Sequence, residues 1–184
     1  MTAIACGGLT REVGEIFYKQ LKATETINDA GYVLEELVES STSKVKACTA
    51  SGIPYAINYR STRDPHDLNF PNSVFLTGTL IGEKGIPVVR EGWAKLKVVG
   101  DNAAIVVGDP IKVSATAGKV DKFTPTAVGA TNSGDVSAAI KSRILEVRTV
   151  VGFAEENVAA GSGSTAGADK VLVKLCIGAV GINA

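Results

Sequence analysis

The sequence predicts a mainly β protein. Short runs rich in Val, Ile and Leu recur along the chain, separated by Gly and Asp turns, a pattern typical of short strands. The 20 Gly among 184 residues indicate many turns. The apolar side chains are mostly Val, Ala, Ile and Leu, which suit thin cores under twisted sheets. We therefore expect a small β-barrel in residues 88–184, a smaller β-rich domain in residues 13–87, and a flexible arm in residues 1–12, which are small and polar.

Two segments of the first half are harder to assign. In residues 13–23 the apolar side chains fit one face of a helix, but several also sit at even spacings and Gly14 weakens a helix. Both alternatives stay open there. In residues 32–38, Leu34, Leu37 and Val38 predict one or two helical turns.

The rest of the first half predicts strands around a long loop. Residues 44–49 and 55–59 alternate polar and apolar side chains, as strands do. Pro65 and Pro71 exclude a regular helix or a central strand from residues 60–73, so this segment is predicted to be a loop.

In the second half, Gly and Asp turns divide the chain into short predicted elements. Asp135 near the start of residues 136–141 favours a short helix there. The Gly- and Ser-rich residues 161–167 predict a hairpin tip. Strands are predicted at residues 86–89, 94–99, 104–107, 110–113, 119–123, 144–151 and 170–177.

A weak internal repeat links the two halves. Residues 13–23 resemble residues 89–98, and the segment that begins at Gly31 resembles the one that begins at Gly108. Two interpretations carry equal weight: a duplicated β unit with a boundary near residues 80–88, or chance similarity. A duplication would make residues 13–23 a strand.

Composition argues against several classes of function. The 19 basic and 19 acidic side chains balance, so no basic field holds a phosphate backbone, and aromatic residues for base stacking are scarce at 5%. No apolar run approaches the ~20 residues of a membrane span, and the first residues lack a signal peptide. The three cysteines are far apart, which favours buried thiols in a reducing compartment. We expect no nucleic acid, membrane, metal or cofactor partner.

Candidate catalytic groups are few. His66, the only histidine, lies between Asp64 and Asp67, but a metal needs three or four converging ligands, and local pairing with aspartate is the favoured interpretation. Cys48 with His66 lacks a visible oxyanion motif, and burial is the favoured fate of Cys48. We therefore predict that the protein is not an enzyme and has no catalytic residues.

The second half contains a strand pattern, Val150-Val-Gly-Phe-Ala154, a turn at residues 155–161 and a second strand pattern, Val171-Leu-Val173. Through these motifs, residues 94–177 resemble the capsid cement, or head decoration, proteins of tailed bacterial and archaeal viruses. It implies a non-enzymatic virion protein on the outside of an icosahedral capsid, made in the host cytoplasm. It also implies a homotrimer that bridges neighbouring subunits of the major capsid protein.

Three places are candidates for protein interfaces. The arm could add a strand to a partner sheet, and the loop at residues 60–73 carries apolar and charged groups. Trp93 is either an interface anchor or a core plug at a barrel end, with equal weight. The candidate interface residues are Thr2, Ile4, Leu9, Arg60, Arg63, Phe70 and Trp93.

Other functions stay open at this point. A tail tube or fibre subunit is one alternative, although the chain lacks a long repeat array. A small hydrolase using Asp64, His66 and Asp67 is another. A carbohydrate-binding module is a weaker alternative, because such modules usually display several surface aromatics.

Overall fold

The structure, a computed structural model, describes residues 16–59 apart from 23, 26, 28 and 29, residues 85–127 apart from 126, and residues 133–177. In this part of the chain the protein is mainly β, as predicted, with one α-helix. The strands form a closed five-stranded barrel and a second, five-stranded sheet. The arm (residues 1–12) and the predicted loop (residues 60–73) lie outside the described residues.

The barrel is built by the first half of the chain. Its strands are β1 (Ile16–Leu21), β2 (Val33–Glu39), β3 (Thr42–Ala47), β4 (Ala56–Asn58) and β5 (Gly85–Val89), in the order β1-β3-β2-β4-β5. β1 and β3 are parallel, and the other neighbours are antiparallel.

The strand alternative for residues 13–23 is thus correct over β1, and the helical turns predicted in residues 32–38 are wrong. The reason is the β2–β3 hairpin. Ser40 and Ser41 both have positive φ, 52° and 61°, which is the twist that a two-residue hairpin turn requires. β2 then pairs with β3 along its length from Leu34 to Glu39.

The second sheet contains β6 (Trp93–Lys97), β7 (Pro110–Val113), β8 (Val120–Lys122), β9 (Val150–Ala154) and β10 (Lys170–Leu175), in the order β6-β10-β9-β7-β8. The prediction placed the barrel here, in residues 88–184, whereas the closed barrel lies between residues 16 and 89. β8 has only three residues, and the outer strands of the second sheet meet at a single parallel bridge, between Val98 and Val120.

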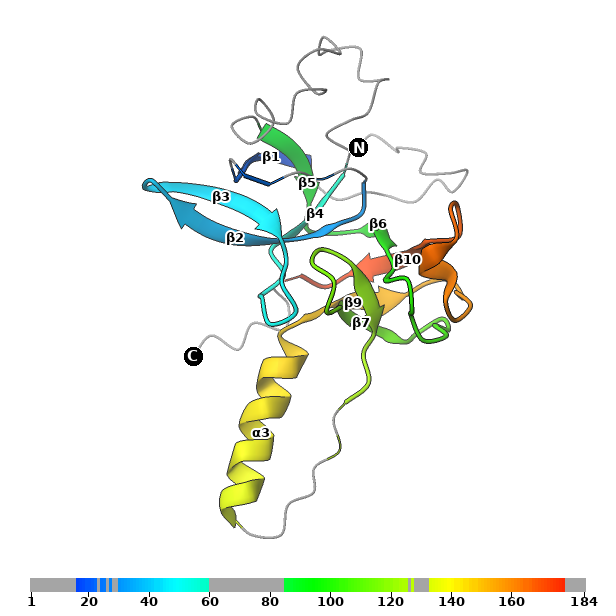
Figure 1. Cartoon of the computed structure of the whole chain (residues 1–184). Helices are drawn as coiled ribbons and strands as arrows, with labels where there is room; N and C mark the ends of the chain where they lie inside the picture. The colour runs from blue at the N-terminus through cyan, green and yellow to red at the C-terminus, as the bar shows by residue number, and fades with distance from the viewer. Residues whose placement is uncertain are drawn as a thin grey trace.

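The helix α3 (Ser133–Val147) lies between β8 and β9 and runs away from both sheets (Figure 1). It is longer than the helix predicted at residues 136–141, and the strand predicted at residues 144–151 begins only at Val150. Apolar residues four, eight and eleven positions after Val136 continue one helix face through residue 147. The helix ends where the Thr149 hydroxyl donates a hydrogen bond to the Glu146 carbonyl, at 2.7 Å.

The barrel and the second sheet share a hydrophobic core. One buried cluster fills the barrel, but a second cluster joins Val33, Ile57 and Val89 of the barrel to Leu96 and Ile111 of the sheet. Backbone hydrogen bonds also connect the two parts: the Lys97 N–H donates to the Gly31 carbonyl at 2.9 Å, and the Val33 N–H donates to the Gly118 carbonyl at 2.7 Å. The predicted boundary at residues 87/88 falls inside β5.

The two sheets have the same topology. Read from its first strand, the barrel has the order β1-β5-β4-β2-β3, and the second sheet has the order β6-β10-β9-β7-β8. Every strand of the barrel therefore corresponds to the strand five places later. In both sheets the first and third strands also meet, and this contact is parallel. In the barrel it is the pairing of β1 with β3; in the second sheet it is the bridge from Val98, the residue after β6, to Val120 of β8. We refer to β1–β5 as the first repeat and to β6–β10 as the second repeat.

Hydrogen bonds between the strands repeat as well. Gly31 and Gly108 occupy equivalent places before β2 and β7, and both have positive φ. The Gly31 N–H donates a hydrogen bond to the carbonyl of Asn58, the last residue of β4. The Gly108 N–H donates one to the carbonyl of Ala154, the last residue of β9. Three more backbone N–H to carbonyl bonds of the first repeat have equivalents in the second. In the first repeat, with the donor named first, they are Lys22 to Val45, Glu25 to Lys22 and Cys48 to Val33. Their equivalents in the second repeat, in the same order, are Val99 to Val120, Asn102 to Val99 and Phe123 to Pro110. These correspondences support duplication over chance similarity, and α3 is then an insertion in the second repeat.

Candidate interaction surfaces

Most of the predicted interface residues lie outside the described part of the chain. This holds for Thr2, Ile4, Leu9, Arg60, Arg63 and Phe70, and also for Asp64, His66 and Asp67. Trp93 is the one predicted interface residue that the structure describes.

Trp93 begins β6 and is half-buried. It is not among the buried residues of the shared core. It borders a crevice of about 210 Å³ between the repeats, together with Gly31, Ile57, Tyr59 and Lys170. Trp93 therefore lies where the first repeat meets the second, at the edge of this crevice.

Trp93 also belongs to a row of side chains across the second sheet. Trp93 pairs with Lys174, Lys174 with Phe153, and Phe153 with Pro110, so the four residues are cross-strand neighbours on one face. The Lys174 Nζ lies 5.7 Å from the centre of the Trp93 ring, a cation–π contact. Phe153 is 46% exposed. We call these four residues the Trp93 row; its aromatic rings around a cation suit a protein interface.

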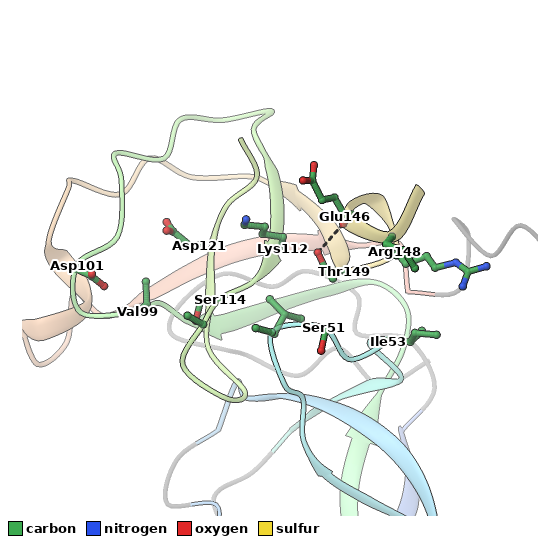
Figure 2. Close-up of a pocket in the computed structure, with 14 residues that line it drawn as sticks. Ser51, Ile53, Val99, Asp101, Lys112, Ser114, Asp121, Glu146, Arg148 and Thr149 are labelled. Carbon is green, nitrogen blue, oxygen red and sulfur yellow. Dashed lines mark hydrogen bonds between the residues drawn. The ribbon is translucent and has the colours of Figure 1, made fainter. Parts of the chain in front are cut away.

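A larger groove of about 610 Å³ lies at the base of α3 (Figure 2). The loop between β3 and β4 contributes Ser51 and Ile53, and β7 contributes Lys112. Leu145 comes from the last turn of α3 and Arg148 from the residue that follows the helix. Two apolar side chains of the groove are largely exposed: Ile53 is 61% exposed and Leu145 is 60% exposed. The sequence did not reveal this groove, because its walls come from segments far apart in the chain. The one signal of this groove in the sequence was Ile53, an apolar residue in the turn Gly52-Ile53-Pro54.

Cys48 is in an environment that opposes nucleophilic chemistry. Its side chain is fully buried. Burial raises the pKa of its thiol, and the neighbouring Glu35 carboxylate raises it further. The thiol thus stays protonated, whereas the thiolate is the reactive form. Burial was the fate favoured for Cys48 from the sequence.

Glu35 is a buried carboxylate with several partners. Its Oε1 lies 2.8 Å from the Lys46 Nζ, and its Oε2 accepts hydrogen bonds from the backbone N–H and the hydroxyl of Thr49, both at 3.1 Å. Burial alone would raise the pKa of Glu35, but the bonds from Lys46 and Thr49 outweigh it and the pKa is lowered. The cluster fixes the loop after β3 to the barrel.

Acidification is therefore expected to weaken the fold through Glu35. Because its pKa is lower in the folded state, its contribution is complete above the unfolded-state pKa of about 4.3 and is lost as the pH falls through the folded-state pKa. The Glu35→Gln variant should lose roughly 1–3 kcal/mol of unfolding free energy at neutral pH. Urea unfolding between about pH 3 and 7 should show a flatter pH dependence for this variant than for the wild type. Equal slopes would contradict the assignment; the exposed Glu91→Gln variant controls for loss of one surface carboxylate.

No group of three His, Cys, Asp or Glu side chains that could hold a metal ion is found among the residues with described positions. Within the same residues, no helix is long and apolar enough to span a membrane. Neither a protein-family model nor a curated protein matches this chain.

Proposed function

We propose that this chain is a virion structural protein of the capsid cement class. In this proposal it binds the outer surface of an icosahedral capsid and stabilises it by bridging subunits of the major capsid protein. The observation that carries the proposal is the repeat. The sequence that resembles cement proteins, residues 94–177, spans the second repeat, and the first repeat has the same topology.

Two copies of one adhesive unit suit a surface that is itself repetitive. Once one repeat is bound, the second faces its own site at a high local concentration, so the chain binds more tightly than either repeat alone. Packaged DNA pushes the shell outward, and a clip across a subunit seam must detach before the subunits separate. Many copies multiply a modest free energy per contact.

The proposed contacts are the arm, the loop at residues 60–73 and the Trp93 row. Trp is enriched among residues that dominate binding energies. Charged side chains such as Arg60 and Arg63 would fix orientation more than strength, because exposed ion pairs typically contribute below ~1 kcal/mol.

The test is to add the purified chain to empty shells that lack it. The chain should bind them and raise their melting temperature. The Trp93→Ala variant should bind roughly tenfold more weakly or worse. Val107→Ala, which shortens an exposed apolar side chain of the second repeat outside the Trp93 row, serves as the control and should bind like the wild type. Absence of binding, or binding without a rise in melting temperature, would refute the proposal.

A further inference from the structure

The Trp93 row has a counterpart in the first repeat. Strand pairing defines it, because both rows cross four strands through the same succession of neighbours. Across β6, β10, β9 and β7, the row consists of Trp93, Lys174, Phe153 and Pro110. Across β1, β5, β4 and β2, the equivalent residues in the same order are Ile16, Val89, Ile57 and Val33. We call these first-repeat residues the counterpart row.

The counterpart row lies at the junction of the two repeats. Val33, Ile57 and Val89 are at most 1% exposed, and they lie outside the cluster that fills the barrel. They belong instead to the cluster shared with the second repeat, which also contains Leu96 and Val171 of the second sheet. The second repeat therefore covers the counterpart row.

The covering surface is the inner face of the second sheet. Neighbours along a strand point to opposite faces. Leu34 and Val88, which adjoin the counterpart row in sequence, fill the barrel. Their equivalents Ile111 and Val173, which adjoin the Trp93 row, belong to the shared cluster. An apolar sheet face thus covers this side of the first repeat.

The same side of the second repeat is exposed and carries a charge. Phe153 is 46% exposed, Lys174 is exposed, and Trp93 and Pro110 are half-buried. Lys174 stands where the counterpart row has Val89, and its contact with the Trp93 ring leaves the charge of its ammonium group unneutralised. Burial of an unpaired ammonium group is costly. A surface that covers this row must therefore supply a carboxylate to Lys174.

We infer that the Trp93 row packs on an apolar sheet face of a different protein, and that a carboxylate in this face pairs with Lys174. A second copy of the chain offers no such face, because its barrel is closed and the inner face of its second sheet already covers its own counterpart row. The inference rests on the proposed function, under which the partner is the major capsid protein.

Variants of Lys174 test the charge, with empty shells that lack the chain as the probe. Lys174→Met keeps an apolar side chain of similar length and leaves the partner carboxylate unpaired, so the dissociation constant should rise roughly 30-fold or more. Lys174→Arg keeps the charge and should restore binding. Lys141→Met removes the same charge from an exposed position on α3 and should bind like the wild type.

Phe153→Ala tests the apolar contact and should raise the dissociation constant roughly tenfold. Thermal unfolding of each free variant, followed by circular dichroism, separates a loss of binding from a loss of folding. If the wild type binds but Lys174→Met binds as well or better, or Phe153→Ala binds equally, the inference fails and the proposed function stands. An oligomer of the free chain that Lys174→Met dissociates would assign the row to a second copy and also overturn the inference. Shells that do not bind the wild type would overturn the proposed function and this inference with it.

Discussion

The Gly31→Ala variant is expected to lose more than ~3 kcal/mol of unfolding free energy, because alanine meets two obstacles there. The backbone of Gly31 has φ +94°, a conformation that side-chain-bearing residues rarely adopt, and a Cβ at this position would lie 2.3 Å from the Lys95 carbonyl oxygen. That oxygen belongs to β6, so the substitution forces the first repeat away from the second. Urea denaturation monitored by circular dichroism measures the loss.

The duplication supplies a matched control. Gly108 is the equivalent of Gly31 in the second repeat and has φ +89°, but nothing lies within 4 Å of its Cβ position. Gly108→Ala therefore brings the backbone strain without the collision, and should cost roughly 1–2 kcal/mol. Equal losses for the two variants would show that the contact between Gly31 and β6 does not matter for stability.

The Leu96→Ala variant is expected to lose about 2–5 kcal/mol, since it opens a cavity in the core that the repeats share. Leu96 is fully buried and belongs to the cluster that joins Val33, Ile57 and Val89 of the barrel to the second sheet. The loss should appear in one cooperative transition for both repeats, followed by far-ultraviolet circular dichroism and by Trp93 fluorescence.

Leu145→Ala makes the same chemical change at a side chain that is 60% exposed, and should alter stability by less than ~0.5 kcal/mol. Two separate transitions in Leu96→Ala, with only one of them shifted, would contradict a shared core.

The sequence predicted the strands best where turn residues bound them. β7 matches its predicted bounds, because Gly108 and Asp109 precede it and residues 115–118 turn after it. β2 was misjudged because its apolar residues also fit helical spacing, and the turn that decides the matter, Ser40-Ser41, lacks the Gly or Asn typical of such turns. Ile144 and Val147 favoured a strand by residue type, whereas their spacing from Val136 favoured the helix that forms.

Closure of the barrel was beyond a local pattern. It depends on pairing β1 with both β3 and β5, contacts between residues far apart in the sequence. The internal repeat was visible from Gly31 and Gly108, yet its meaning required the order of the strands. Within the Trp93 row, Trp93 stood out in the sequence by its residue type. Phe153 was not, because alternation in β9 defines two faces without showing which one stays uncovered.

A cryo-electron microscopy reconstruction of empty shells mixed with the chain tests the central claim most directly. The account predicts density for the chain on the outer surface, with contacts to more than one capsid subunit and the Trp93 row at a contact. Density confined to a tail or portal vertex, or shells without added density, would contradict it.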